Sequence, residues 1–296
     1  MDGEQQANDG TETMSEKYSS PLNEDSLRSC VPTRVFKCST PICSVDWSPD
    51  GLVLVLGSES GWIQFYSALS GLLIKSINCQ RYGSVMAVRF LRSDGSIVLI
   101  ATNCLKQEPA LQEHPYCIRS WSLERNMIQK QFPLSSPLLP DYGLCVHPLK
   151  SLFLVCCEDK KIRLHDVNGN APICIIQSYC LPTLAIFDTE GFVFACILEK
   201  QKVHLFTVDE TSELKYFNCS DAIEEEDAFI CHIVFSPDSN YFAISTNSWQ
   251  HIGFRALYGQ KLCDYRPPLN AYRGAIVHLP PAPTFSADGK FFLSGV

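Results

Sequence analysis

Residues 45–51 read Val-Asp-Trp-Ser-Pro-Asp-Gly, and they precede the apolar run Leu52 to Leu56, a Gly-Ser-Glu-Ser-Gly turn and the alternating run Trp62-Ile63-Gln64-Phe65-Tyr66. In a Ser-Pro-Asp-Gly segment, proline presets φ and glycine accepts a positive φ, so the segment is typical of a tight turn. A short apolar run predicts a buried strand, and alternation predicts a half-buried one. The stretch therefore predicts a tight turn followed by two strands of one sheet.

The same order of features recurs along the chain. Copies begin at Val234-Phe235-Ser236-Pro237-Asp238 and Thr284-Phe285-Ser286, weaker ones at Val146-His147-Pro148 and Ile186-Phe187-Asp188, and a degenerate one at Val88-Arg89-Phe90, which carries Ser93-Asp94-Gly95. Ser48, Ser93, His147, Asp188, Ser236 and Ser286, taken as equivalent points, are separated by 45, 54, 41, 48 and 50 residues. A period of roughly 40 to 45 residues with insertions is that of a propeller blade of four short strands. The sequence predicts an all-β propeller with about five full repeats and a partial sixth.

Composition favours a folded intracellular protein. The chain has 296 residues, 46% of them hydrophobic, and its net charge of −8 argues against direct nucleic-acid binding through phosphate contacts. The 15 cysteines are odd in number and irregularly spaced, which fits buried thiols in a reducing compartment. With no Cys-x2-Cys pair and scattered histidines, we expect no metal site and no cofactor.

The N-terminal segment differs from the rest. Residues 1–26 are acidic and polar, so we expect a disordered leader that is neither a secretory signal nor a transit peptide, with residues 27–296 as the propeller. No apolar run approaches the length of a membrane span, so we expect no membrane contact.

Several motifs together resemble one branch of the WD-repeat family. They are Leu27-Arg28-Ser29 leading to Arg34-Val35-Phe36, Tyr82-Gly83, Lys161-Ile162-Arg163-Leu164, the turn from Phe187 to Gly191, and Ser245-Thr246-Asn247. In this order they look like the small WD-repeat subunit of COMPASS-type histone methyltransferase complexes. The terminal Trp-Asp of each repeat is replaced, for example by His165-Asp166 and Phe206-Thr207, so the hydrogen-bonded tetrad of regular repeats would be mostly absent and apolar packing would carry more of the fold.

The resemblance implies a seven-bladed propeller in the nucleus that acts as a scaffold. Its partners would be a histone methyltransferase catalytic subunit or a phosphatase-targeting scaffold of transcription termination, with RNA polymerase II reached indirectly. An adaptor of another pathway, such as a ubiquitin-ligase substrate receptor or a ribosome-assembly factor, remains the alternative. No catalytic motif is recognisable, so we expect no enzyme activity.

The chain departs from this family in three places. Residues 103–116 enlarge a loop of the second repeat, and Asp221 to Asp227 form an acidic connection. The sequence also stops inside the expected sixth blade, which suggests truncation. In the family the early strand, here about Val31 to Phe36, pairs with C-terminal strands to close the ring.

Four residues are candidates for partner binding. Binding surfaces favour aromatic and arginine side chains on exposed loops. Arg81 and Tyr82 lie in a connection between repeats, whereas Lys160 and Trp249 lie in turns between second and third strands. We expect all four to share one rim of the propeller; the alternative is that the aromatic rings cap blade cores and the charges are ordinary surface residues.

Overall fold

A computed structural model describes residues 23–29, 31, 35, 38, 40–104, 114–139, 143–267, 280 and 282–294. Within these ranges the chain forms five four-stranded antiparallel sheets, each built from four consecutive strands, and one two-stranded sheet. This count confirms the prediction of five full repeats and a partial sixth.

The strands of each sheet follow one another in the sequence. The first two sheets consist of β1 (Ile42–Trp47), β2 (Val53–Ser58), β3 (Trp62–Ser67) and β4 (Leu73–Asn78), then β5 (Ser84–Phe90), β6 (Ile97–Asn103), β7 (Tyr116–Ser122) and β8 (Met127–Leu134). The third and fourth consist of β9 (Leu144–Val146), β10 (Leu152–Cys156), β11 (Lys161–Asp166) and β12 (Pro172–Gln177), then β13 (Leu184–Phe187), β14 (Val193–Glu199), β15 (Lys202–Thr207) and β16 (Glu213–Asn218). The remaining strands are β17 (Ile230–Phe235), β18 (Tyr241–Thr246), β19 (His251–Arg255) and β20 (Lys261–Tyr265), then β21 (Thr284–Phe285) and β22 (Phe292–Leu293).

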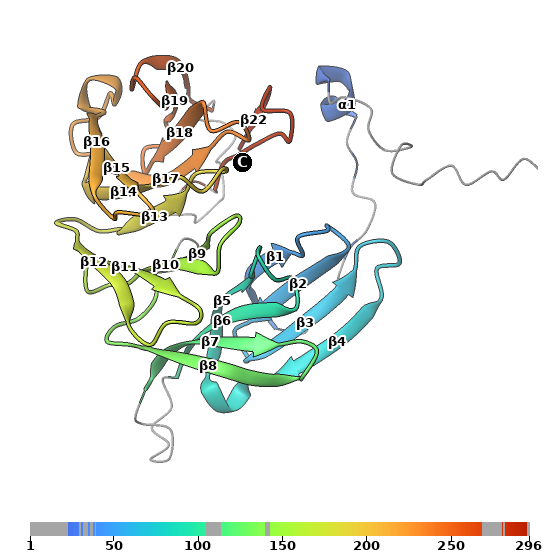
Figure 1. The fold of residues 1–296 in the computed structure, drawn as a ribbon. Coiled ribbons are helices and arrows are strands. Elements are labelled where there is room, and N and C mark those ends of the chain that lie inside the picture. The colour runs from blue at the N-terminus through green and yellow to red at the C-terminus, as the bar shows by residue number, and fades with distance from the viewer. Residues whose placement is uncertain are drawn as a thin grey trace, which may run out of the picture.

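The sheets succeed one another along an arc (Figure 1). The first strands contact each other in turn, β1 against β5, β5 against β9, β9 against β13, β13 against β17 and β17 against β21. First strands therefore lie innermost and fourth strands outermost, which is the arrangement of propeller blades.

A repeated turn explains why the blades start where they do. The Ser48 hydroxyl donates to Asp50 Oδ1 at 2.5 Å and accepts from the backbone N–H of Val53 at 2.8 Å. The pairs Ser236 with Asp238 and Ser286 with Asp288 repeat the first bond at 2.6 Å. Each turn thus satisfies its own polar groups between the first and second strands.

The second blade corrects one predicted equivalence. The backbone bond from Ser48 N to Val53 O, 2.8 Å long, is matched by Leu91 N to Ile97 O at 2.9 Å. Leu91 follows β5 directly, as Ser48 follows β1. Leu91, not Ser93, is therefore the equivalent point, because Ser93-Asp94-Gly95 resembles the motif in letters but lies two residues later.

Apolar cores fill the boundaries between neighbouring sheets. Four clusters of buried side chains join the first sheet to the second, the second to the third, the third to the fourth and the fourth to the fifth. Aromatic pairs cross three of these boundaries: Phe65 with Phe90, Phe132 with Phe153, and Phe217 with Phe242. Burial of this apolar area is the main stabilising contribution, at about 25 cal/mol per Å².

His165 belongs to one of these cores. It is 5% exposed, stacks on Phe153 with ring centroids 5.1 Å apart and meets Phe132 edge-on. Neither ring nitrogen has a hydrogen-bond partner among the described residues. Burial, helped by the charge of Arg163, lowers the pKa of His165 from 6.5 to about 4.

The described cysteines are all free thiols, and most are shielded from solvent. Burial raises the pKa of the Cys156 and Cys196 thiols well above the ordinary value and that of Cys219 to about 12. Cys263 on the outer strand β20 is the exposed one within the described ranges. These thiols agree with the prediction of buried cysteines.

The N-terminal part and the long loop are described only in pieces. Helix α1 (Glu24–Arg28) begins at Asn23, whose side chain accepts from Ser26 N at 2.7 Å. The rest of the predicted leader, residues 105–113 of the enlarged loop and all of the predicted closing strand except Val31 and Val35 lie outside the described residues. None of the helices in the described ranges is long and apolar enough to cross a membrane.

Candidate docking surface

The four predicted binding residues lie on one edge of the arc, which we call the turn rim. The turn rim consists of the turns between second and third strands together with the connections from each fourth strand to the next sheet. Backbone hydrogen bonds join the two kinds of loop within a blade: Cys79 N to Gly61 O at 2.8 Å, Ser178 N to Lys160 O at 2.7 Å, and Cys219 N to Gln201 O at 2.9 Å. The turn rim is therefore a continuous hydrogen-bonded surface in the blades that it joins.

Arg81 and Tyr82 lie together in the short 3-10 helix η2 (Gln80–Tyr82), between β4 and β5. Arg81 is exposed and Tyr82 is half-buried against the core of the first two sheets. The Arg81 guanidinium carbon lies 4.4 Å from the centre of the Tyr82 ring, and that of Arg119 on β7 lies 4.0 Å from it. The ring therefore caps a core and also carries two cations.

Arg119 was missed by the sequence reasoning. It is 6% exposed, and it stands in β7 between apolar residues, where a hydrophobic side chain would be expected. A charged residue at a buried strand position was the available signal, because ionised groups are rarely buried without a partner.

Lys160 and Trp249 occupy equivalent positions in their turns. Their φ angles are +60° and +64°, and Gly61 has +84° in the first blade. The N–H of each donates to the carbonyl three residues earlier, at 3.2 Å for Lys160 and 3.0 Å for Trp249. A residue with a side chain costs roughly 1 kcal/mol more than glycine in this conformation. Both side chains are present where glycine fits better.

A groove opens beside Lys160, between the third and fourth sheets. Its volume is about 720 Å³. The lining includes Tyr179, Leu181, Lys200 and Glu226, and Tyr179 is 75% exposed. The groove therefore offers apolar surface and both signs of charge to a bound segment.

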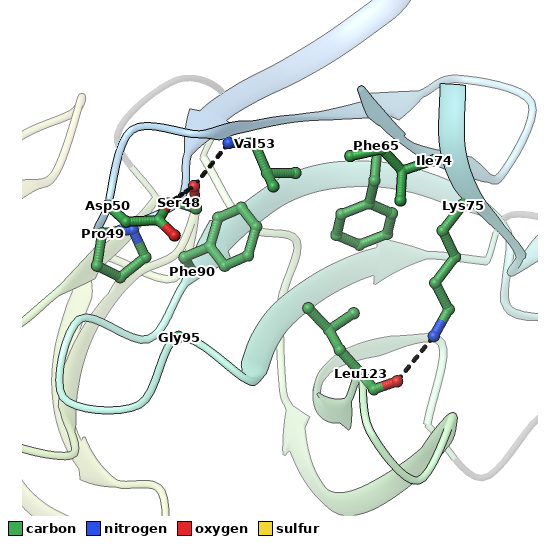
Figure 2. A pocket seen from close by; sticks show the side chains of 10 residues that line it. All are labelled: Ser48, Pro49, Asp50, Val53, Phe65, Ile74, Lys75, Phe90, Gly95 and Leu123. Carbon is green, nitrogen blue, oxygen red and sulfur yellow. Dashed lines mark hydrogen bonds between the residues drawn. The ribbon is translucent and has the colours of Figure 1, made fainter. Parts of the chain in front are cut away.

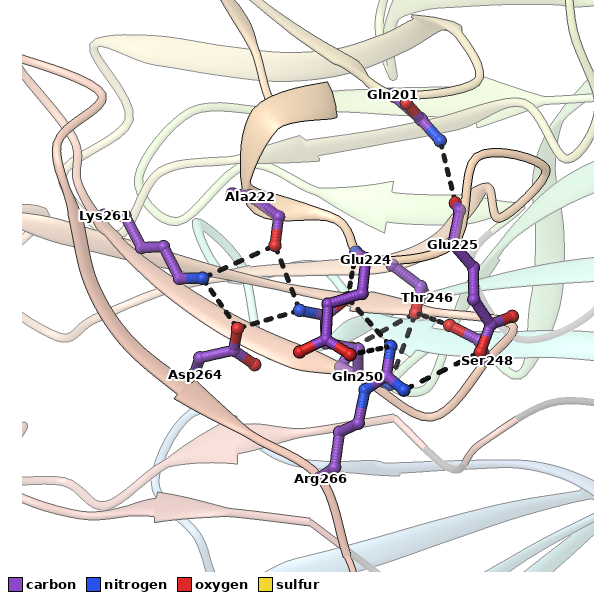
Figure 3. Close-up of polar contacts among 10 residues, drawn as sticks. All are labelled: Gln201, Ala222, Glu224, Glu225, Thr246, Ser248, Gln250, Lys261, Asp264 and Arg266. Carbon is purple, nitrogen blue, oxygen red and sulfur yellow. Dashed lines mark hydrogen bonds and ion pairs between the residues drawn. The ribbon is translucent and has the colours of Figure 1, made fainter.

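The acidic connection follows η4 (Ser220–Ala222) and is anchored by a buried amide (Figure 3). Gln250 is fully buried; its Nε2 donates to Ala222 O at 3.0 Å, and its Oε1 accepts from Glu224 N at 3.1 Å. Arg266 pairs with Glu224 at 3.2 Å. Trp249 precedes Gln250 directly, so its turn is tied to this acidic surface.

A second pocket lies on the opposite rim, between the first and second sheets (Figure 2). Its volume is about 400 Å³, and Phe65 and Phe90 are among its lining residues. Lys75 Nζ donates across it to Leu123 O at 2.8 Å. None of the four predicted residues contributes to it.

Groups of three or more His, Cys, Asp or Glu side chains placed to hold a metal ion do not occur in the described part of the chain.

Comparison with known proteins agrees with the blade architecture. Residues 30–67 match the model of the WD domain, G-beta repeat. The chain is 24% identical to WD repeat-containing protein 82 of Drosophila melanogaster over 93% of its own length and 80% of that protein.

Two yeast proteins are similar over about three quarters of the chain. Identity is 25% to COMPASS component SWD2 of Saccharomyces cerevisiae and 23% to Set1 complex component swd2 of Schizosaccharomyces pombe. The alignments span 64% and 58% of those proteins, less than two thirds of each. The blades, the WD-domain match and these relatives together identify the chain as a WD-repeat protein.

Proposed function

We propose that this chain is a non-catalytic scaffold subunit of a nuclear chromatin-modifying complex of the Set1/COMPASS type. Its similarity along most of its length to WD repeat-containing protein 82 and to two Set1-complex components carries the proposal. The partner would be a segment of the methyltransferase catalytic subunit or of a phosphatase-targeting scaffold, with RNA polymerase II engaged indirectly through these partners.

The turn rim is the proposed docking surface. Lys160 and Trp249 keep side chains at left-handed positions, and backbone strain of this kind is concentrated at functional sites. Arg81 is exposed beside an aromatic ring, and arginine and aromatic residues are enriched where binding energy is concentrated. The rim thus presents the residue types that a protein partner uses.

Affinity purification from nuclear and cytoplasmic extracts, followed by mass spectrometry, tests the assignment. Set1-type methyltransferase or phosphatase-scaffold subunits are expected from the nuclear extract. Recovery of a ubiquitin ligase or of ribosome-assembly factors instead would favour the alternative adaptor function and refute the proposal.

Replacing Trp249 and Arg81 by alanine is expected to weaken binding of the recovered partner at least about tenfold, because hot-spot side chains contribute more than 1.4 kcal/mol each. Titration calorimetry with the purified partner measures the change. Tyr258→Ala and Arg125→Ala are matched controls, since both residues are exposed and lie in turns of the opposite rim. Equal affinities for all four variants would exclude the turn rim.

Lys160→Gly separates binding from folding. Relief of the left-handed strain, about 1 kcal/mol, offsets the backbone entropy of glycine, about 0.5–1 kcal/mol, so the free energy of unfolding should change by less than about 1 kcal/mol. Lys160→Ala keeps the strain and removes the same charge. Denaturant titration and partner binding of both variants give the comparison. Weaker binding with unchanged stability in both assigns the lysine to docking, and unchanged binding in both removes it from the site.

A further inference from the structure

The guanidinium of Arg119 is buried without an acidic partner. Among the described residues its one hydrogen bond runs from Nη1 to the Thr102 hydroxyl at 2.5 Å, and its Nε has no partner. No ion pair of the described residues includes Arg119 or Arg81. Burying an unpaired charge costs several kcal/mol, so this arrangement needs a compensating group.

The third blade shows what a paired version looks like. Arg163 on β11 occupies the position of Arg119 on β7, because each lies three residues before the end of the register with its second strand. Arg163 is 8% exposed and binds the carboxylate of Asp159, which stands four residues earlier. Four residues before Arg119 stands Pro115. The second blade therefore keeps the cation and lacks the carboxylate.

A second cation lies on the same aromatic ring. Arg81 and Arg119 both place their guanidinium carbons within 4.4 Å of the Tyr82 ring centre. Two like charges around one ring repel each other, and the ring's electron density offsets that repulsion only in part. A carboxylate between them would accept from both guanidinium groups.

We propose that Arg81, Tyr82 and Arg119 form a receptor for one aspartate or glutamate side chain of the docked protein segment. The inference rests on the proposed docking function and names the chemistry that the rim recognises. A single carboxylate fits the planar fork of a guanidinium. The net charge of −8 disfavours a polyanion such as a nucleic acid, whereas one carboxylate is held by the local cations.

Two sets of short peptides test the receptor on the full chain by fluorescence anisotropy. One set tiles a Set1-type methyltransferase; the other is a library of random sequences. Every acidic peptide has a copy with Asp→Asn or Glu→Gln at one position. For bound peptides, one such change is expected to weaken binding at least about tenfold. Arg81→Gln and Arg119→Met should each weaken the acidic peptide similarly and leave its neutral copy unaffected, with Arg125→Gln as the control.

The outcomes separate this inference from the proposed function. Acidic library peptides that bind through Arg81 and Arg119, while no methyltransferase peptide binds, support the receptor and count against the methyltransferase partner. Methyltransferase peptides that bind as well as their neutral copies overturn the receptor and leave docking intact. A phosphoserine copy that binds more than about tenfold tighter than the glutamate peptide also overturns the choice of a carboxylate.

Stability provides a second readout. Because an apolar side chain of similar size removes the unpaired charge, Arg119→Met should melt no lower than the wild-type protein. A lower melting temperature would mean that the guanidinium serves the fold, which contradicts the inference. If this variant does not fold, Arg81→Gln decides, because Arg81 is exposed.

Discussion

Gly83→Ala is expected to lower the free energy of unfolding by about 3 kcal/mol or more. Gly83 has a φ of +92°, and a Cβ there would lie 2.2 Å from the carbonyl oxygen of Asn103 and 2.7 Å from the Cα of Cys104. Both are backbone atoms at the end of β6, so no side chain can rotate away. Left-handed strain of about 1 kcal/mol adds to the displacement of η2 from the second sheet.

Gly51→Ala is the matched control for Gly83→Ala. Gly51 also has a positive φ, +70°, but a Cβ there would meet nothing within 4 Å. It should lose only the strain contribution of about 1 kcal/mol. Denaturant titration followed by tryptophan fluorescence compares the two. Equal losses would show that η2 does not rest against β6 as described, and with it the placement of Arg81 and Tyr82 would fall.

The wild-type protein is expected to lose about 2 kcal/mol of stability at pH 5 and about 3 kcal/mol at pH 4, relative to pH 8, through His165 alone. The pKa of His165 falls from 6.5 to about 4 on folding. Between these values the unfolded chain binds a proton that the folded chain does not bind. This contribution is therefore complete above pH 6.5 and is lost as the pH falls towards 4.

His165→Leu removes the titrating group from the core between Phe132 and Phe153. Burial also lowers the pKa of His147 and His251, so the variant will retain some acid sensitivity. The difference between the two stability curves isolates His165, and His114→Gln is the control at an exposed position. If the wild-type and His165→Leu curves run parallel from pH 8 to 4, His165 is solvated in the folded protein.

The fold was predictable because the turn chemistry repeats. Ser48, Ser236 and Ser286 bond their own turns in the way that the Ser-x-Asp pattern predicts. The second blade was placed two residues late, because Leu91 has no hydroxyl and so left no recognisable letter in the sequence. Periodicity finds blades, but the exact register of a degenerate one depends on backbone bonds that any residue can make.

The site was predictable only in part. Loop position sufficed to place Arg81, Tyr82, Lys160 and Trp249 on one rim. Arg119 could not be assigned to them, because its contact with Tyr82 joins residues 37 positions apart and depends on how the first two sheets pack. Nor could the left-handed φ of Lys160 be read from a sequence in which glycine does not mark the turn.

The shared edge of the blades has a consequence for affinity. Arg81 and Tyr82 lie at the junction of the first two sheets, whereas Lys160 and Trp249 lie on the third and fifth, all held in one rigid frame. A partner segment that reaches both places binds the second site intramolecularly, at an effective concentration set by the length of chain between its two anchors. Two weak contacts can then act together about 10² to 10⁴ times more strongly than either alone. Lengthening the partner's spacer should weaken binding without touching any contact residue.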